Sequence, residues 1–135
     1  MLEFKDGIND DLIKLFFIEI NKTSMKRLDF EKFKKAYESR SIVLSLWDND
    51  ALICFGSMLT DWTMNSIIYD VVVVEAFQKK GFGKKMMTEL MSRTPDARFY
   101  LTSTFGNEDF YKKLGFKKHK TAFALYPNDS AYLES

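Results

Sequence analysis

The fold of this chain is decided by one stretch of sequence, Val71-Val72-Val73-Val74-Glu75-Ala76-Phe77-Gln78-Lys79-Lys80-Gly81-Phe82-Gly83-Lys84-Lys85. The β-branched residues at its start predict a buried strand. An amphipathic helix follows, with an apolar stripe at Phe82, Met86, Leu90 and Met91. The pattern Gln-x-x-Gly-x-Gly stands between strand and helix, and glycine permits both a tight turn and the close approach of a ligand to the backbone.

The turn between this strand and this helix has the features of a phosphate-binding loop. A helix start presents unpaired N–H groups and the positive end of the helix dipole. Four lysines add positive charge around the turn: Lys79, Lys80, Lys84 and Lys85. The turn is not a Walker loop, because the Gly-Lys-Ser/Thr ending is missing, and it is not a dinucleotide fingerprint, because Met86 occupies the third glycine position. A purely structural turn that needs Gly81 and Gly83 is the alternative.

A second motif lies downstream: Phe110-Tyr111-Lys112-Lys113-Leu114-Gly115-Phe116. The gap between the motifs fits one helix and one strand. Together they resemble the acyl-coenzyme A (acyl-CoA) loop and the Tyr-x-x-x-Gly-Phe signature of the GNAT superfamily of N-acyltransferases, clearly over residues 65–126 and weakly before residue 40. The resemblance implies an α/β fold with a mixed, mostly antiparallel central sheet that is splayed into a V, with helices on both faces. We expect one GNAT-like acyltransferase domain over residues 1–135.

Periodicity, capping residues and turn residues predict the individual elements. We expect strands over residues 2–5, 41–47, 51–59, 66–74, 97–103 and 116–125. We expect helices over residues 11–20, after Asp29, from the glycine turn to about 93, and between Asn107 and Gly115. Candidate N-caps for three of these helices are Asp10 or Asp11, Asp29, and Asn107.

Composition narrows the class of protein. The chain has 135 residues, a net charge of +1 and 46% hydrophobic residues, which suits one domain and provides no field that would gather nucleic acid. A single cysteine, Cys54, excludes an internal disulfide and is most simply a core residue. No apolar run is long enough to span a bilayer and the N-terminus lacks a signal-peptide pattern, so we expect a cytoplasmic protein without membrane contact.

The resemblance implies acetyl-CoA as the co-substrate. The Val73 N–H would then polarise the thioester carbonyl, as an oxyanion hole with one donor. The pantetheine arm would pair with the backbone of the splayed strand, and the pyrophosphate would rest on N–H groups of the glycine turn. The implied cofactor-binding residues are Val71, Val73, Gln78, Lys79, Lys80, Gly81, Phe82, Gly83, Lys84 and Asn107.

Tyr111 is the candidate general acid by the same resemblance. A phenol has a reference pKa near 10, so it is protonated at neutral pH and can donate a proton to a thiolate leaving group. The alternative is an aromatic side chain that fills space beside Phe116. Phe110 and Tyr111 are neighbours on a short helix, and we expect one of the two to be core. Asn107 is either an N-cap or a contact to the pantetheine arm.

Other polar residues carry weaker signals. Asp70 precedes four valines, and a buried carboxylate needs a partner; it either takes a proton from an amine, binds a cationic acceptor, or bonds to loop backbone. The family's strand glutamate is not matched at Ile67 or Tyr69. His119 lies in a charged stretch and is more simply solvent-exposed, and no cluster has metal-ligand spacing, so no metal is expected. Trp47 and Trp62 either line an acceptor cleft or contact a partner.

The sequence thus predicts an N-acetyltransferase that moves an acetyl group from acetyl-CoA to a primary amine of a small molecule or peptide. The alternative is a non-catalytic acyl-CoA-binding module of the same fold. Neither the acceptor, the general base nor the length of the acyl group can be inferred. We also expect a homodimer, because the apolar segment Ala122-Phe123-Ala124-Leu125-Tyr126 would form an exposed edge strand that needs a cover.

Overall fold

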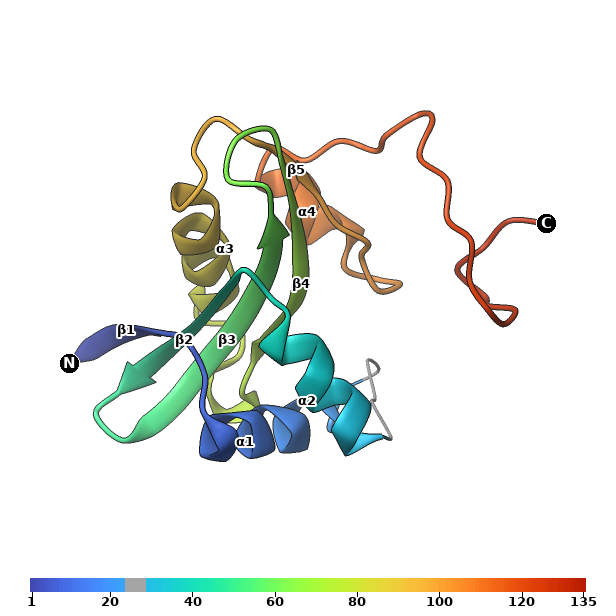
Figure 1. Ribbon diagram of the computed structural model, residues 1–135. Helices are drawn as coiled ribbons and strands as arrows, with labels where there is room; N and C mark the ends of the chain where they lie inside the picture. Colours follow the sequence, from blue (N-terminus) through green and yellow to red (C-terminus); the bar gives the residue numbers. More distant parts are fainter. Residues whose placement is uncertain (24–28) are drawn as a thin grey trace. The chain divides into compact units, whose positions relative to one another are not determined.

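The computed structural model describes residues 1–23 and 29–135 and is drawn in Figure 1. Its strands are β1 (Leu2–Asp6), β2 (Ile42–Asp48), β3 (Ala51–Thr60), β4 (Asn65–Val73) and β5 (Arg98–Tyr100). Its helices are α1 (Asp10–Ile20), α2 (Phe30–Glu38), the 3-10 turn η1 (Glu75–Phe77), α3 (Phe82–Ser92) and α4 (Glu108–Lys113). The chain separates into two compact units, Met1–Thr104 and Phe105–Ser135.

The first unit contains one five-stranded sheet in the order β1-β2-β3-β4-β5. Neighbouring strands from β1 to β4 are antiparallel, and β5 pairs with β4 in parallel. That last pairing joins only Asn65, Ser66 and Ile67 of β4 to β5. Strand β5 ends at Tyr100, opposite Ile67, so the rest of β4 has no pairing with β5. The structure confirms the expected mixed, mostly antiparallel sheet.

Helices cover both faces of this sheet (Figure 1). Helices α1 and α2 pack on one face, where aromatic rings fill much of the core. Phe16 stacks on Phe55 with ring centroids 4.2 Å apart, and Phe33 stacks on Tyr37 at 4.6 Å. Helix α3 packs on the opposite face, where Met86, Met87 and Leu90 are fully buried. Within residues 1–23 and 29–135, no helix combines the length and the apolar character that crossing a bilayer requires.

Helix caps agree with the expectations in part. The Asp29 side chain accepts a hydrogen bond from the Lys32 N–H at 3.1 Å and caps α2 as predicted. Helix α1 is capped by Asn9, whose Oδ1 accepts from the Leu12 N–H at 2.9 Å. The expected cap at Asp10 or Asp11 was therefore wrong by one or two positions. Both aspartates lie in the first turn instead, where negative charge also favours a helix start.

The predicted last strand was wrong. Residues 116–125 form turn and irregular structure, and Phe123 and Leu125 are almost fully exposed. An alternating apolar pattern becomes a strand only when a ladder partner is present, because β-propensity mainly measures fit to a half-buried surface. The strand expected over 97–103 is also shorter, at Arg98–Tyr100. The edge-strand reason for a homodimer does not hold, and the dimer itself stays a prediction.

Strand β4 contains a bulge at its centre. Phe55 is opposite Val72 and Ser57 is opposite Tyr69, so Asp70 and Val71 together face the single residue Gly56. Asp70 has a left-handed backbone with φ of 54°. Two hydrogen bonds show how the bulge changes the neighbour that the backbone groups of this strand face. The Met64 carbonyl accepts from Arg98 on the β5 side at 2.7 Å, whereas the Val74 N–H donates to Ile53 on the β3 side at 2.9 Å.

Residues 64 and 74 are an even number of positions apart, so in a regular strand their backbone groups would face the same neighbour. The bulge inserts one extra residue and reverses this alternation. As a result Val72 is buried against the cluster of α1 and α2, and Val73 directs its backbone groups away from β3.

Gly56 lies opposite the bulge and under α3, which yields a prediction about stability. An added Cβ would lie 2.9 Å from Leu90 Cδ1, 3.2 Å from Val71 Cγ2 and 3.3 Å from Met86 Cγ. We expect Gly56→Ala to lower the free energy of unfolding by about 1–3 kcal/mol through overpacking, as measured by urea denaturation. Leu90→Ala makes room, so the Gly56→Ala/Leu90→Ala double variant should lose less than the sum of the two single losses. Additive losses would contradict overpacking as the cause.

Candidate functional site

The Val73 backbone lies on an open strand edge. Val73 is paired with Cys54 at a position between the hydrogen-bonded pairs of β3 and β4, so its N–H and C=O point away from β3. Its carbonyl accepts a hydrogen bond from Gln78 Nε2 at 3.0 Å. On the same side, β5 pairs only with Asn65–Ile67 among the described residues of the first unit. Within the first unit, the Val73 N–H therefore stands on the edge of β4 that β5 leaves unpaired.

The turn after β4 leads directly from this edge to the start of α3. The 3-10 turn Glu75–Phe77 is followed by Lys79 and Gly81, both with left-handed backbones at φ of 63° and 85°. Gly81 is the N-cap of α3 and has no side-chain cap hydrogen bond. The first turn of α3 contains no acidic residue, so the N–H groups of Phe82, Gly83 and Lys84 have no carboxylate competitor there. This arrangement suits a phosphate.

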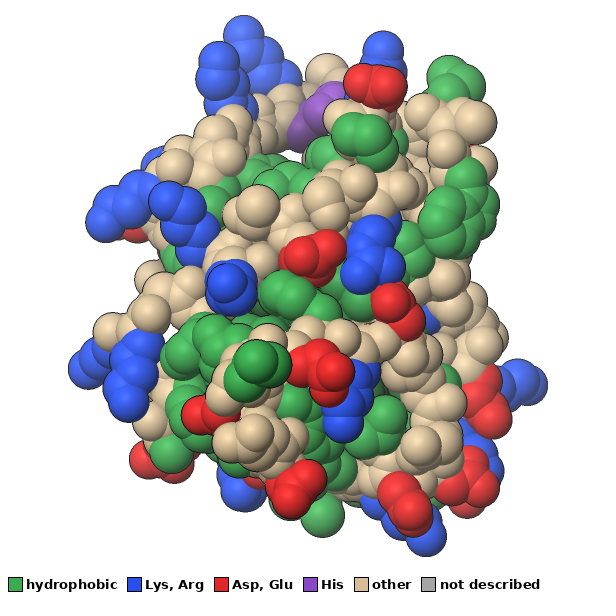
Figure 2. All heavy atoms as spheres, turned by 90° about the vertical axis from the view of Figure 1, so that its left-hand side faces the viewer, with side chains coloured by type: hydrophobic (Ala, Val, Ile, Leu, Met, Phe, Trp, Pro, Cys, Tyr) green, Lys and Arg blue, Asp and Glu red, His purple; other side chains and the backbone are tan. Residues whose placement is uncertain are grey.

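Aromatic and basic side chains support the same turn. Phe77 and Phe82 make an edge-to-face ring pair with centroids 6.2 Å apart, and the Lys80 ammonium lies 6.0 Å from the Phe77 ring. The ring pair joins the two sides of the turn and limits its conformations. On the face of the molecule in Figure 2, acidic and basic side chains are mixed with apolar ones, in keeping with the net charge of +1. Any attraction of an anion to this turn therefore comes from nearby groups and not from the charge of the whole chain.

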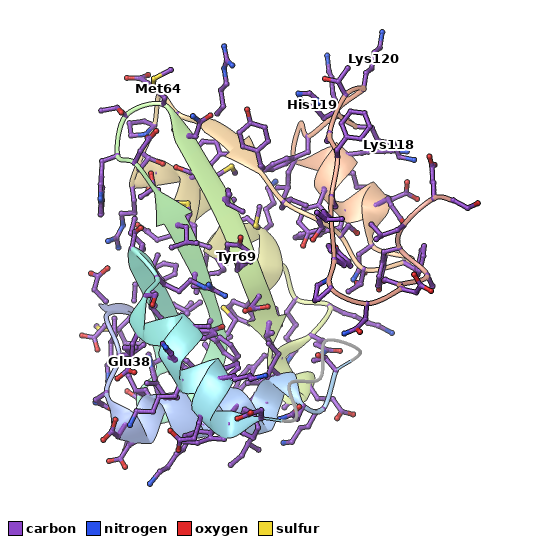
Figure 3. All side chains as sticks on the ribbon, turned by 45° about the vertical axis from the view of Figure 1, so that its right-hand side comes forward. Glu38, Met64, Tyr69, Lys118, His119 and Lys120 are labelled. Carbon is purple, nitrogen blue, oxygen red and sulfur yellow. The ribbon has the colours of Figure 1, made fainter. Side chains whose placement is uncertain are left out.

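Asp70 is held by Arg40. The Asp70 side chain is only 6% exposed and its Oδ2 lies 3.5 Å from Arg40 Nη2. This ion pair was not among the three roles that the sequence suggested for Asp70, namely a base, a contact to a cationic acceptor, and a hydrogen bond to loop backbone. The Arg40 guanidinium also lies over the ring of Tyr69, 4.2 Å from its centroid, and Figure 3 labels Tyr69 midway along β4. Sequence reasoning missed Arg40, because no local pattern connects it to a carboxylate 30 positions further along the chain.

A cavity of about 310 Å³ lies in the first unit near the β3–β4 loop. Two arginines, two carboxylates, two aromatic rings and several smaller residues line it: Asp6, Gly7, Ile8, Tyr37, Glu38, Arg40, Ser41, Ile42, Val43, Trp62 and Arg93. Asp61 shapes the adjacent loop, because its Oδ1 accepts from three backbone N–H groups at 2.7–3.0 Å. Those bonds, led by the one from Asn65, lower the pKa of Asp61 to about 2. Trp62 thus lines a cavity, whereas Trp47 is a core residue.

The second unit contains Tyr111 in a well-defined helix end. Gly115 has a φ of 96°. Its N–H donates to the Lys112 carbonyl at 3.0 Å, and the Phe116 N–H donates to the Tyr111 carbonyl at 3.1 Å. These two bonds make a Schellman motif, in which the residues at either end of the motif usually touch. The rings of Tyr111 and Phe116 do so, with centroids 6.0 Å apart.

Tyr111 is half-buried, and burial raises the pKa of its phenol. Its ring also meets Phe110 edge-to-face at 5.0 Å. Phe110 is likewise only partly buried, so the expectation that one of the two is core was wrong. Asn107 occupies the N-cap position of α4 without a side-chain cap hydrogen bond. Lys118, His119 and Lys120 follow α4 on exposed chain (Figure 3), which agrees with a solvent-exposed histidine but places it outside any strand.

Comparison with known families identifies the family of this chain. The model of the Acetyltransferase (GNAT) domain family matches residues 39–118. The chain belongs to the GNAT acetyltransferase family. It is 31% identical over 128 residues to an uncharacterized N-acetyltransferase of Pyropia yezoensis, a match that covers 87% of this chain and 74% of that relative. By this membership the protein is an acyltransferase.

Solved structures agree with the GNAT assignment. A probable acetyltransferase from Staphylococcus aureus superimposes with a TM-score of 0.80 at 18% identity, covering 96% of this chain and all of the other. A GNAT-family acetyltransferase from Streptococcus pneumoniae has a TM-score of 0.76 at 19% identity, with 96% of this chain and all of the other covered. At such low identities these two structures show a shared fold.

The expected GNAT residues fall into two groups. Val71, Val73 and the turn from Gln78 to Lys84 lie together in the first unit, and Tyr111 and Asn107 lie in the second. Cys54 is fully buried, and burial raises the pKa of its thiol to about 12, as suits the core residue that was predicted. In the described parts of the chain, no group of His, Cys, Asp and Glu side chains is arranged to hold a metal ion.

The turn at Gly81 yields a prediction with a matched control. Gly81 and Gly7 have nearly equal φ values, 85° and 88°, and an added Cβ at either meets no atom within 4 Å. Alanine should therefore cause similar backbone strain at both positions. We expect Gly81→Ala to weaken acetyl-CoA binding at least ~10-fold, a loss of ~1.4 kcal/mol, because it disturbs the N–H groups at the start of α3. Gly7→Ala should bind normally. Equal affinities of the two variants in calorimetry would refute the phosphate site.

Proposed function

We propose that this GNAT protein transfers an acetyl group from acetyl-CoA to a primary amine of a small molecule or peptide by direct attack. The observation that carries the proposal is that the Val73 edge leads within one short turn to the start of α3, whose first turn holds no acidic residue. The open edge suits the amide groups of the pantetheine arm, which can pair with it as an added strand. The helix start and the lysines around it suit the pyrophosphate.

The polar groups of this region also match those of acetyl-CoA. Pantetheine contains amides and needs backbone partners, which the Val71 to Val73 segment offers at its open side. A pyrophosphate needs several N–H groups and no carboxylate, which matches the first turn of α3. The residues present thus fit acetyl-CoA along its length.

The chemical step needs polarisation of a carbonyl and protonation of a sulfur. Acetyl-CoA supplies the acyl group and a thiolate leaving group. The Val73 N–H donates a hydrogen bond to the thioester oxygen and stabilises the negative charge that develops there. The neutral amine forms the new C–N bond as the C–S bond breaks, and the amine nitrogen loses a proton to solvent. Tyr111 gives its phenol proton to the departing sulfur and regains a proton from solvent before the next cycle. Much of the acceleration comes from holding the two substrates in place.

No carboxylate base is part of this proposal. Asp70 was a candidate base, but its carboxylate is buried and ion-paired with Arg40. A general base must reach the proton that it takes, directly or through one water. The amine therefore enters as the free base, which any weakly basic acceptor supplies at moderately alkaline pH. Asn107 contacts the pantetheine arm in this proposal, a role carried over from the family resemblance.

Free-thiol release tests the function directly. The purified protein is incubated with acetyl-CoA and a panel of alkyl amines, amino sugars, peptides with a free N-terminus and lysine peptides, and CoA thiol is followed by a colour reaction. Cys54 is buried with a raised pKa, so it should not react with the thiol reagent in the folded protein. Release that depends on one class of amine supports the transferase. Tight binding of acetyl-CoA with no release for any amine would favour the non-catalytic module.

The role of Tyr111 is tested by Tyr111→Phe. Phenylalanine keeps the ring contact with Phe116 and removes only the hydroxyl. We expect acetyl-CoA affinity to stay within error and turnover to fall about 10²-fold or more, the usual contribution of a general acid. Tyr132→Phe is the matched control in the same unit, because Tyr132 also packs on a phenylalanine, Phe105, at 4.3 Å. A wild-type turnover number for Tyr111→Phe would exclude it as the acid.

The raised pKa of Tyr111 predicts the pH dependence of its role. Burial disfavours the charged form of the phenol, so the pKa of Tyr111 is raised above its ordinary value of 10.0. An acid that must be protonated works below its pKa and fails above it. We therefore expect any loss of turnover from Tyr111 ionisation to have its midpoint above pH 10, measured at saturating amine. A decline with its midpoint below pH 10 that disappears in Tyr111→Phe would contradict this assignment.

A further inference from the structure

Arg40 connects three elements at the β4 bulge. It follows α2, and its Nε donates to Ser57 Oγ on β3 at 3.2 Å. Its Nη2 lies 3.5 Å from the Asp70 carboxylate on β4. Its guanidinium plane covers the Tyr69 ring at 4.2 Å. The Arg40 side chain is 13% exposed and that of Asp70 is 6% exposed, so these contacts are largely shielded from water.

The residue that Arg40 holds has a costly backbone conformation. Asp70 has a φ of 54°, in the left-handed region that non-glycine residues seldom adopt. Such a conformation persists only where the surroundings enforce it. Ser57 contributes on the β3 side, since its hydroxyl lies 3.4 Å from the Tyr69 carbonyl as a donor. Arg40 is the charged group that reaches both Ser57 and Asp70.

The position of the kink decides what the open edge presents. The extra residue at the bulge reverses the alternation of β4, and Val73 rather than Val72 or Val74 then faces away from β3. A strand that lost the kink would shift its register by one residue and turn the Val73 N–H toward β3. The polarising donor of the proposed reaction depends on a strained aspartate.

We propose that Arg40 is a positioning residue that keeps Asp70 in its left-handed conformation and so keeps the Val73 N–H on the open edge. The catalytic consequence rests on the proposed acetyl transfer. Arg40 does not touch the reacting atoms and acts through Asp70 and the β4 backbone. An arginine suits this role better than a lysine, because its planar fork bonds to two partners at once while its face stacks on a ring.

The test is a double-mutant cycle of Arg40→Met and Asp70→Gly. Glycine adopts positive φ without penalty, so it should hold the kink without help. We expect Arg40→Met to lower turnover about 5- to 30-fold, the ratio that corresponds to the cost of a left-handed residue. In the Asp70→Gly background the same substitution should change turnover far less. Lys34→Met is the control, because it breaks a different ion pair of the same unit, with Asp10 at 3.4 Å, and should leave turnover unchanged.

A second measurement is independent of turnover. The Val74 amide donates to Ile53 only while the kink is in place, so its hydrogen exchange, resolved by NMR, reports the β4 register directly. We expect faster exchange in Arg40→Met, near-normal exchange in the double variant, and no change in Lys34→Met. Normal Val74 exchange in Arg40→Met would overturn the proposal. So would a loss of turnover in Asp70→Gly as large as in Arg40→Met, because Asp70 would then act as a chemical group.

The two measurements also separate this proposal from the proposed function. A wild-type protein that releases no thiol with any amine would refute acetyl transfer, and Val74 exchange would still decide whether Arg40 holds the kink. A wild-type protein that turns over, with Arg40→Met equally active and equally protected at Val74, would refute the role of Arg40 alone.

Discussion

One interruption in a regular ladder controls the geometry of this protein. Antiparallel pairing forces backbone groups to alternate between two neighbours, and β4 breaks that alternation once, at Asp70 and Val71 opposite Gly56. Before the break, β4 pairs with its neighbours in the sheet, and Ser66 lies in the pairing with β5. On the other side, Val72 enters the core of α1 and α2 while Val73 faces an open edge. Without the break, β4 could either bury Val72 in the core or present the Val73 N–H to the proposed ligand, but not both.

The same break joins the stability of the core to the shape of the site. Gly56 leaves room for Val71 next to Met86 and Leu90 of α3, so the face that holds α3 in place is built around the bulge. Helix α3 begins at Phe82, directly after its N-cap Gly81, where the turn from β4 ends. Packing that secures the far part of this helix therefore also orients the N–H groups at its start. Small changes under α3 should displace the proposed phosphate site at its start, because closely packed interiors transmit displacement.

The sequence predicted those features whose physics is local. Apolar periodicity located α1, α2 and α3, the β-branched run located β4, and glycine spacing located the turn at Gly81. The bulge had no such signal, because a left-handed aspartate looks like any other polar residue in the sequence. Its partner Arg40 belongs to a distant segment, and ion pairs across a fold are set by tertiary structure. The prediction of a strand over residues 116–125 was wrong for the opposite reason. These residues have the local pattern of a strand, but the structure supplies no ladder partner.

Local physics also explains why the Tyr111 motif could be recognised. In a Schellman motif the residue after the helix needs a positive φ, which favours glycine, and the next residue contacts the last full turn. Gly115 and Phe116 take these two places, and Phe116 packs against the Tyr111 ring. The spacing Tyr-x-x-x-Gly-Phe thus ends the helix and also holds the Tyr111 ring against Phe116. Burial raises the pKa of the Tyr111 phenol, so the packing at this helix end also favours the protonated form that the proposed general acid requires.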